Sequence, residues 1–145
     1  MKNPGYEFID HTADVQVKSW GNNLEEAFAQ TAYSLMATIT PDLKKITPKI
    51  EKNVYIKAED KEAQLFDFLS EFLYIFDVEG LIFNHVKVEY IKKSNHNYEL
   101  KAILKGEKFS KEKHEIGIEV KAITYSYMKI EENIDNVKIN IIFDI

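Results

Sequence analysis

The chain has 145 residues, of which 30% are charged, with no cysteine and a formal net charge of −5 at pH 7. This length suits one domain with its own hydrophobic core, and the missing cysteines exclude disulfides, thiolate metal sites and thiol nucleophiles. No apolar run is long enough for a membrane span, and the start, MKNPGYEF, lacks the apolar segment of a secretion signal, so we expect a cytoplasmic protein without a membrane partner.

The first half of the chain predicts a strand, a helix and a second strand. Residues 6–19 are mostly apolar and predict one strand. Residues 21–39 repeat apolar side chains at helical spacing, with Asn23 as N-cap, Glu26 three residues later and Pro41 as the stop. Residues 45–59 predict an extended segment, and Pro48 makes it either an edge strand or a broken one.

Residues 59–80 predict a second helix, capped by Asp60 and stopped by Gly80. Its expected apolar stripe comprises Leu65, Phe66, Leu69, Phe72, Leu73 and Phe76. Phe68 and Ile75 extend the apolar surface beyond one face, so we expect this helix to be covered on more than one side.

The remainder of the chain predicts β-structure. Residues 85–93 and 98–106 alternate like the strands of a hairpin, and residues 106–117 form a charged loop. A long strand over 118–131, a turn at 133–136 and a last strand over 137–145 complete the chain. This order predicts an α+β fold in a single domain over residues 1–145, with two helices packed on a largely antiparallel β-sheet.

Two aspartates lie in the first predicted strand, where aspartate is uncommon because it gains little from burial. If the strand is regular, Asp10 and Asp14 lie on the same face, opposite His11 and Val17, and roughly 13 Å apart. They cannot then bind one ion together, and each needs partners from elsewhere in the chain. His11 faces the core, where a hydrogen-bonded structural histidine is the commoner role.

The last strand continues to the final residue and offers two carboxylates, those of the Asp144 side chain and the Ile145 terminus. If this strand pairs with the first, Asp14, Asp144 and Ile145 converge, and three carboxylates repel one another unless a cation neutralises them or some are protonated. An oxygen-only set suits a hard ion such as Ca²⁺ or Mg²⁺. The alternative is an ordinary solvated chain end. No zincin, P-loop, nucleophile-elbow or dinucleotide fingerprint occurs in the sequence.

Several blocks of the sequence together resemble the archease family. They are DHTADVQV, LEEAFAQTAYSLM, LFDFLSEFLYIFDVEGLIF, KGEKFSKEKHEIGIEVKAITYSYMKI and the closing FDI. The blocks occur in the family's order and span nearly the whole chain. A departure from common members is Gln16-Val17-Lys18, where many carry a glycine, and we do not expect it to disturb a metal site.

The resemblance implies a protein cofactor rather than an enzyme. Archease proteins assist the GTP-dependent tRNA-splicing ligase, which joins RNA ends bearing a 3′-phosphate or 2′,3′-cyclic phosphate to a 5′-hydroxyl. They promote guanylylation of the ligase and its multiple turnover. The resemblance also implies a divalent metal held by Asp14, Asp144 and Ile145, with Ca²⁺ expected first and Mg²⁺ or Mn²⁺ as alternatives.

The composition agrees with a protein partner. All 19 basic residues are lysine, so no guanidinium fork is available for phosphates or bases, and an acidic chain of this kind is expected to meet RNA only through the ligase. Glu119 and Lys121 are accessory candidates near the metal, with an ordinary cross-strand ion pair as the alternative. His114 is a third, with a plain surface position as the alternative.

Two other classes of function stay open at this level. A chaperone or general interaction module would also suit a small α+β domain with an aromatic-rich helix. A metal-dependent hydrolase would need a nucleophile or base, and the sequence offers none beyond these carboxylates.

Overall fold

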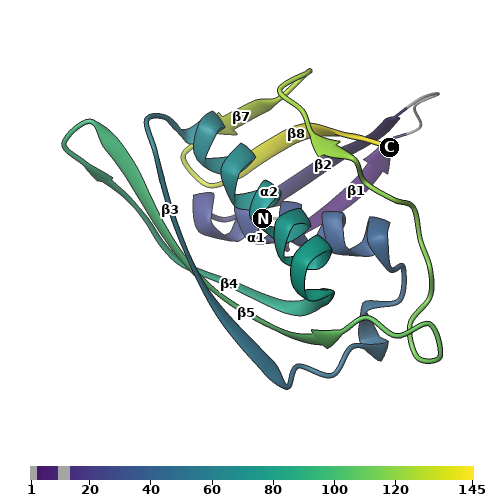
Figure 1. Cartoon of the computed structure of the whole chain (residues 1–145). Coiled ribbons are helices and arrows are strands. Elements are labelled where there is room, and N and C mark those ends of the chain that lie inside the picture. Colours follow the sequence, from purple (N-terminus) through teal and green to yellow (C-terminus); the bar gives the residue numbers. More distant parts are fainter. Residues whose placement is uncertain (1–2, 10–13) are drawn as a thin grey trace.

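The computed structural model describes residues 3–9 and 14–145. Two α-helices lie between two antiparallel sheets (Figure 1). In chain order the elements are β1 (Gly5–Ile9), β2 (Asp14–Gly21), α1 (Leu24–Ile39), the short 3₁₀ helix η1 (Leu43–Lys45), β3 (Ile50–Ala58), α2 (Lys61–Glu79), β4 (Leu81–Ser94), β5 (Asn97–Lys108), β6 (Ala122–Ile123), β7 (Lys129–Glu132) and β8 (Val137–Asp144). The predicted α+β class is confirmed, with the strands divided between two sheets.

The larger sheet has the order β1-β2-β8-β6, and β7 pairs with the other end of β8 on the same side as β6. The smaller sheet has the order β3-β5-β4. β3 is thus an edge strand, as Pro48 predicted. The predicted hairpin is formed by β4 and β5, and its turn places Asn95 at a φ of 53°, a conformation that asparagine tolerates better than most residues.

Both helices begin and end at the predicted residues. The Asn23 side chain accepts a hydrogen bond from the Glu26 amide at 2.9 Å, and the Asp60 side chain accepts one from the Ala63 amide at 2.7 Å. α1 ends just before Pro41. α2 ends at Gly80, whose φ of 70° is in the left-handed region that glycine adopts without strain.

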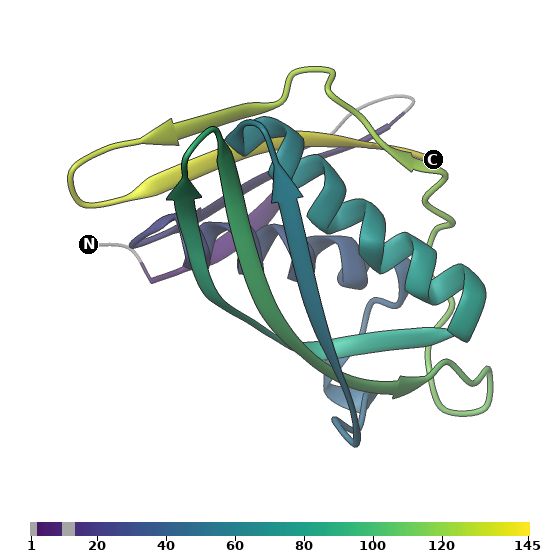
Figure 2. The same cartoon turned by 60° about the vertical axis from the view of Figure 1, so that its left-hand side comes forward.

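The core lies between the sheets and is built around the two helices. α1 contacts β2, β8 and β4, and α2 contacts strands of both sheets, which confirms that α2 is covered on more than one side. The buried centre of α2 is formed by Leu65, Phe68, Leu69, Phe72 and Ile75. The buried stripe is displaced from the predicted one, because Phe66, Leu73 and Phe76 are only partly buried. The helices cover only the inner face of the larger sheet, whose outer face is open (Figure 2).

The single strand predicted over 6–19 is wrong. β1 and β2 pair antiparallel, with Phe8 opposite Val17 and Ile9 opposite Gln16, so the chain reverses direction between them. Phe8 therefore shares the face of Val17, whereas an unbroken strand would have placed it on the opposite face. The expected orientation of Asp10, His11, Thr12 and Ala13 lies outside the described residues.

The long strand predicted over 118–131 is also wrong. Only β6 and β7 are regular there, and they are separated by a turn in which Tyr127 has a φ of 57°. Residues 109–121, which we call the strap, run from the end of β5 to β6 without regular structure. Apolar and polar residues alternate in this region as they do in a strand, but most of its backbone does not pair with a neighbouring strand. Alternation in the sequence does not show whether a segment has such a partner strand.

Within the described residues, none of the helices combines the length and the apolar character that crossing a bilayer requires.

Candidate carboxylate site and the buried glutamate that anchors the strap

Asp14 and Asp144 lie directly opposite each other on neighbouring strands. Asp14 is the first residue of β2, Asp144 is the last residue of β8, and the register pairs the two. Residues opposite each other in an antiparallel pair point to the same side, with Cβ atoms roughly 4.5–5.5 Å apart. Both aspartates are half-buried. The sequence predicted this meeting on the condition that the first and last strands pair, and β2 and β8 do pair.

The backbone of Asp144 is held from both sides. β2 pairs with it on one side, and Ala122 of β6 pairs with it on the other. The Lys121 amide also donates a hydrogen bond to the Asp144 carbonyl oxygen at 2.7 Å. Ile145 follows directly and is half-buried. A side chain at the end of an edge strand would be free to fray, but Asp144 sits between two partners and is fixed in place.

The two accessory candidates on the strap differ in position. Lys121 is exposed, and its backbone amide contacts Asp144. Glu119 is exposed two residues earlier. The strand that was expected to place both side chains on one face is absent here. Within the described part of the chain neither residue makes an ion pair, so the alternative given for them, an ordinary cross-strand ion pair, is not observed there.

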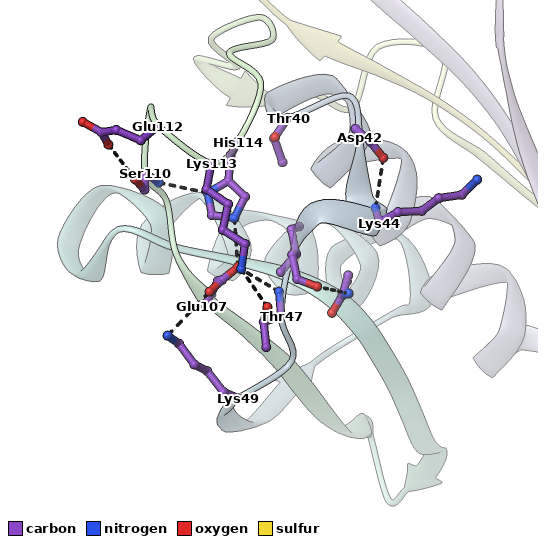
Figure 3. Close-up of polar contacts among 12 residues, drawn as sticks. Thr40, Asp42, Lys44, Thr47, Lys49, Glu107, Ser110, Glu112, Lys113 and His114 are labelled. Atoms are coloured by element: carbon purple, nitrogen blue, oxygen red, sulfur yellow. Dashed lines mark hydrogen bonds and ion pairs between the residues drawn. The ribbon is translucent and has the colours of Figure 1, made fainter.

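His114 does not belong to the carboxylate site. It is 3% exposed, and its Nε2 lies 3.0 Å from Glu107 Oε2 at the end of β5, in the other sheet (Figure 3). Its Nδ1 accepts a hydrogen bond from the Ser110 amide at 2.9 Å, so the ring proton is on Nε2 and points to Glu107. The surface position expected from the charged loop is therefore wrong, because the loop folds its histidine inward.

Glu107 is the buried centre of this group. Burial by itself raises the pKa of the Glu107 carboxyl, but hydrogen bonds from Lys113, the Thr47 amide and His114 outweigh it and lower the pKa to about 2. The Lys113 ammonium lies 2.7 Å from Oε2, and that of Lys49 lies 3.7 Å from Oε1. We call Glu107, His114, Lys113 and the Thr47 amide the Glu107 clasp.

The clasp is the first of a series of contacts that fasten the strap to the body of the protein. The Thr40 hydroxyl donates to the Glu115 carbonyl at 2.8 Å, and the amides of Gly117 and Ile118 donate to carbonyls at the end of α1, both at 2.8 Å. A Cβ at Gly117 would lie 2.2 Å from the Thr38 carbonyl oxygen, so only glycine fits. These contacts bring the far end of the strap to Asp144 in a defined position.

Sequence reasoning missed Glu107 and the outer-face cleft described below. Glu107 stands in a segment interpreted as a charged loop, and a pattern of charges does not reveal which one is buried. The cleft depends on the pairing of β1 with β2, which the continuous-strand interpretation concealed.

The donor set at the sheet end has the chemistry of a hard-cation site. Across residues 3–9 and 14–145, no three side chains of His, Cys, Asp or Glu gather in a way that could hold a metal ion. Asp14 and Asp144 supply two side-chain carboxylates, so a third protein ligand has to come from elsewhere, and Ile145 is the adjacent residue. These ligands are all oxygen atoms, which fits Ca²⁺, Mg²⁺ or Mn²⁺ and disfavours softer metals.

Comparison with known families settles the relationship of this chain. The sequence profile of the archease protein family matches residues 6–145. The chain belongs to the archease family. It is 44% identical over 126 residues to the archease of Pyrococcus furiosus, covering 87% of each chain. An archease-like protein of Dictyostelium discoideum is 39% identical over 143 residues, covering 97% of this chain and 93% of its own.

Solved archease structures share the fold. The solution structure of a Methanobacterium thermoautotrophicum protein superposes with a TM-score of 0.85 at 34% identity, covering 97% of this chain and 99% of its own. The crystal structure of a Thermotoga maritima archease, described as a possible chaperone, gives a TM-score of 0.59 at 25% identity, covering 100% and 98%. The family assignment predicted from the sequence blocks is confirmed by both comparisons.

Proposed function

We propose that this archease is a non-catalytic activator of a GTP-dependent tRNA-splicing RNA ligase. It promotes guanylylation of the ligase and multiple turnover in the joining of 3′-phosphate or 2′,3′-cyclic phosphate ends to a 5′-hydroxyl. Family membership supports the partner. The observation that carries the proposal is the direct pairing of Asp14 with Asp144, because two carboxylates side by side form an oxygen-only donor set that suits a divalent cation.

The proposed ligands of the divalent cation are the side chains of Asp14 and Asp144 and the carboxylate of Ile145. When bound, the cation neutralises this cluster and offers a positive centre to phosphate oxygens. Ca²⁺ is the first expectation, with Mg²⁺ or Mn²⁺ as alternatives, since all three accept oxygen ligands.

The chain's own residues position this cluster for insertion into a partner. The pairing of Asp144 with both β2 and β6 fixes its backbone, and the strap fixes Lys121 beside it. A ligase channel that holds RNA and GTP is electropositive, so a protruding set of carboxylates is attracted to it over long range. In this proposal the cluster acts at the nucleotide site of the ligase, where an active-site histidine of the ligase attacks the α-phosphate of GTP.

The test is a guanylylation assay of the ligase with added wild-type protein, Asp14→Asn or Asp144→Asn. Both substitutions keep the size of the side chain and remove its charge, and we expect each to lower the stimulation at least about tenfold. Asp135→Asn, in the exposed turn before β8, is the matched control and should stimulate like the wild type. Full stimulation by both site variants would refute the proposal.

A chaperone is the competing function, and the description of the Thermotoga maritima protein favours it. A chaperone should suppress aggregation of unrelated proteins without metal and should tolerate a two-residue extension after Ile145. A ligase activator that uses the Ile145 carboxylate should lose its stimulation on the same extension, because the carboxylate is moved away from Asp14 and Asp144. A single extended variant therefore separates the two functions.

A further inference from the structure

The outer face of the larger sheet contains a cleft of about 780 Å³. β2 and β8 form its floor, Glu7 of β1 lies on one rim, and residues 127–131 form the other. Pockets for small ligands in proteins commonly measure about 300–1,000 Å³. The side chains on this face come from the same strands that carry Asp14 and Asp144, but from their opposite ends.

The register places two lysines in the middle of the cleft. Lys18 pairs with Asn140, and Lys138 pairs with Trp20, so the two lysines are diagonal neighbours on adjacent strands. Diagonal neighbours have Cβ atoms about 7–8 Å apart, a spacing at which two ammonium groups can hold one phosphate between them. Within the described residues neither lysine makes an ion pair, whereas Lys129 at the rim is 3.4 Å from Glu131.

Tyr127 is held over the rim in a strained conformation. Its φ of 57° is unfavourable for a residue with a bulky side chain, and its side chain is 75% exposed. The Asn140 amide donates to its carbonyl oxygen at 2.8 Å, which fixes this conformation from the floor of the cleft. Strain that the surrounding structure maintains, while leaving an aromatic ring in solvent, is typical of a binding position.

Amide groups connect this end of the face with the carboxylates. Gln16 Nε2 donates to Asn140 Oδ1 at 2.9 Å, and Gln16 precedes Lys18 on the same face and follows Asp14. The cleft thus presents three lysines, two glutamates, amides and two aromatic residues, and its side chains include few aliphatic ones. Glu7 lies opposite Lys18 and Glu131 opposite Lys138, so the lysines outnumber the carboxylates by one. Lysines beside an exposed ring match a phosphate beside a planar base better than they match an apolar peptide.

We propose that this cleft binds a ribonucleoside phosphate, with the phosphate at Lys18 and Lys138 and the base against Tyr127. The ligand is either a free nucleotide or the terminal nucleotide of an RNA strand. The chemistry of the cleft carries this inference by itself. Its connection to the carboxylates, about 13 Å away along β2, rests on the proposed function.

The experiment uses the full chain without ligase, so its outcome is independent of the guanylylation assay. The chain has one tryptophan, Trp20, which lines the cleft, so a ¹⁵N-labelled sample gives one indole N–H signal from this place. The protein is titrated separately with GMP, with a short RNA ending in a 3′-phosphate, and with inorganic phosphate. We expect GMP, the RNA or both to shift the Trp20 indole and Asn140 amide signals at lower concentration than phosphate does.

The response to GMP compared with RNA distinguishes the two sources of the ligand. Lys18→Gln with Lys138→Gln should weaken binding at least about tenfold, whereas the matched pair Lys57→Gln with Lys87→Gln, exposed lysines of the smaller sheet, should not. Equal responses to phosphate and nucleotide, no response to any of the three probes, or equal losses in both lysine pairs would overturn the proposal.

Tyr127→Gly separates binding from structure. Glycine adopts the left-handed conformation without strain, so this variant should unfold at the same temperature as the wild type or higher. It should nevertheless bind the nucleotide several-fold more weakly, because the ring is gone. Tyr55→Ala removes a similarly exposed tyrosine of the smaller sheet and should bind normally. Unchanged binding by Tyr127→Gly would contradict the role given to the ring.

Discussion

The Glu107 clasp and the Asp14–Asp144 pair are both carboxylate centres, but they differ in their burial and in the groups that lie directly opposite them. Glu107 is 4% exposed and receives hydrogen bonds from a lysine, a histidine and a backbone amide. Asp14 and Asp144 are half-buried and face each other as like charges. A buried carboxylate surrounded by donors holds a structure together, whereas two carboxylates side by side at a sheet end together attract a cation.

The largest expected effect on stability comes from the clasp. Glu107→Ala leaves Lys113 without its carboxylate and the His114 Nε2 proton and the Thr47 amide without an acceptor. We expect it to lower the free energy of unfolding by about 3–5 kcal/mol, as measured by urea denaturation. Glu115→Ala, an exposed side chain on the same strap, should change it by less than about 0.5 kcal/mol. Comparable small losses in both variants would show that the clasp does not stabilise the fold.

A smaller loss is expected where the strap crosses the end of α1. Gly117→Ala places a methyl group 2.2 Å from the Thr38 carbonyl oxygen, and relieving this clash should cost about 1–3 kcal/mol. At Gly80 a Cβ meets nothing within 4 Å, so Gly80→Ala should cost only the strain of a positive φ, about 1 kcal/mol. The unfolding temperatures of the two variants therefore compare the cost of a steric clash at residue 117 with the cost of backbone strain at residue 80. A Gly117→Ala protein as stable as the wild type would mean that the strap is not fastened here.

Acid should weaken the clasp selectively. The folded-state pKa of Glu107, about 2, lies below the ordinary value of 4.5, so its contribution to stability is complete above about pH 4.5 and is lost as the pH falls toward 2. Glu107→Gln cannot titrate, so its free energy of unfolding should fall less steeply than that of the wild type between these pH values. Parallel curves for the two proteins would show that Glu107 has no depressed pKa.

The Glu107 clasp and the Asp14–Asp144 pair also differ in how far the sequence predicts them. Helix caps, the edge strand after Pro48 and the β4–β5 hairpin were predictable, because each depends on residues close together in the chain. The meeting of Asp14 with Asp144 needed only one assumption, that the last strand pairs with the first. The position of His114 was not predictable, because its partner Glu107 and the Thr47 amide come from segments whose approach no local pattern encodes.

The hairpin of β1 and β2 was missed for a different reason. The sequence between them includes Asp10 and Thr12, and short polar side chains such as these favour turns as well as disrupting strands. The alternation of the flanking residues hides this turn chemistry, because it continues on both sides of the polar segment. The error reversed the faces of β1 and concealed the outer-face cleft, but it left the face of β2 correct.

The smallest effect on stability is expected at the carboxylate pair itself. Asp14→Asn or Asp144→Asn should change the free energy of unfolding by less than about 0.5 kcal/mol in a chelator, because both side chains are only half-buried at the end of the sheet. Adding Ca²⁺ should then make the wild type clearly more stable than either variant. An ion that binds only the folded state at about 100 times its dissociation constant adds about 2.7 kcal/mol, which raises the unfolding temperature of the wild type by several degrees.

The variants should gain much less from Ca²⁺, and Asp135→Asn should gain as much as the wild type. Equal gains in the wild type and both site variants would place the cation elsewhere. A large loss of stability in the chelator would instead mean that the pair is structural, like Glu107. The size of the change without metal therefore decides whether Asp14 and Asp144 stabilise the sheet or are kept at its end for a ligand.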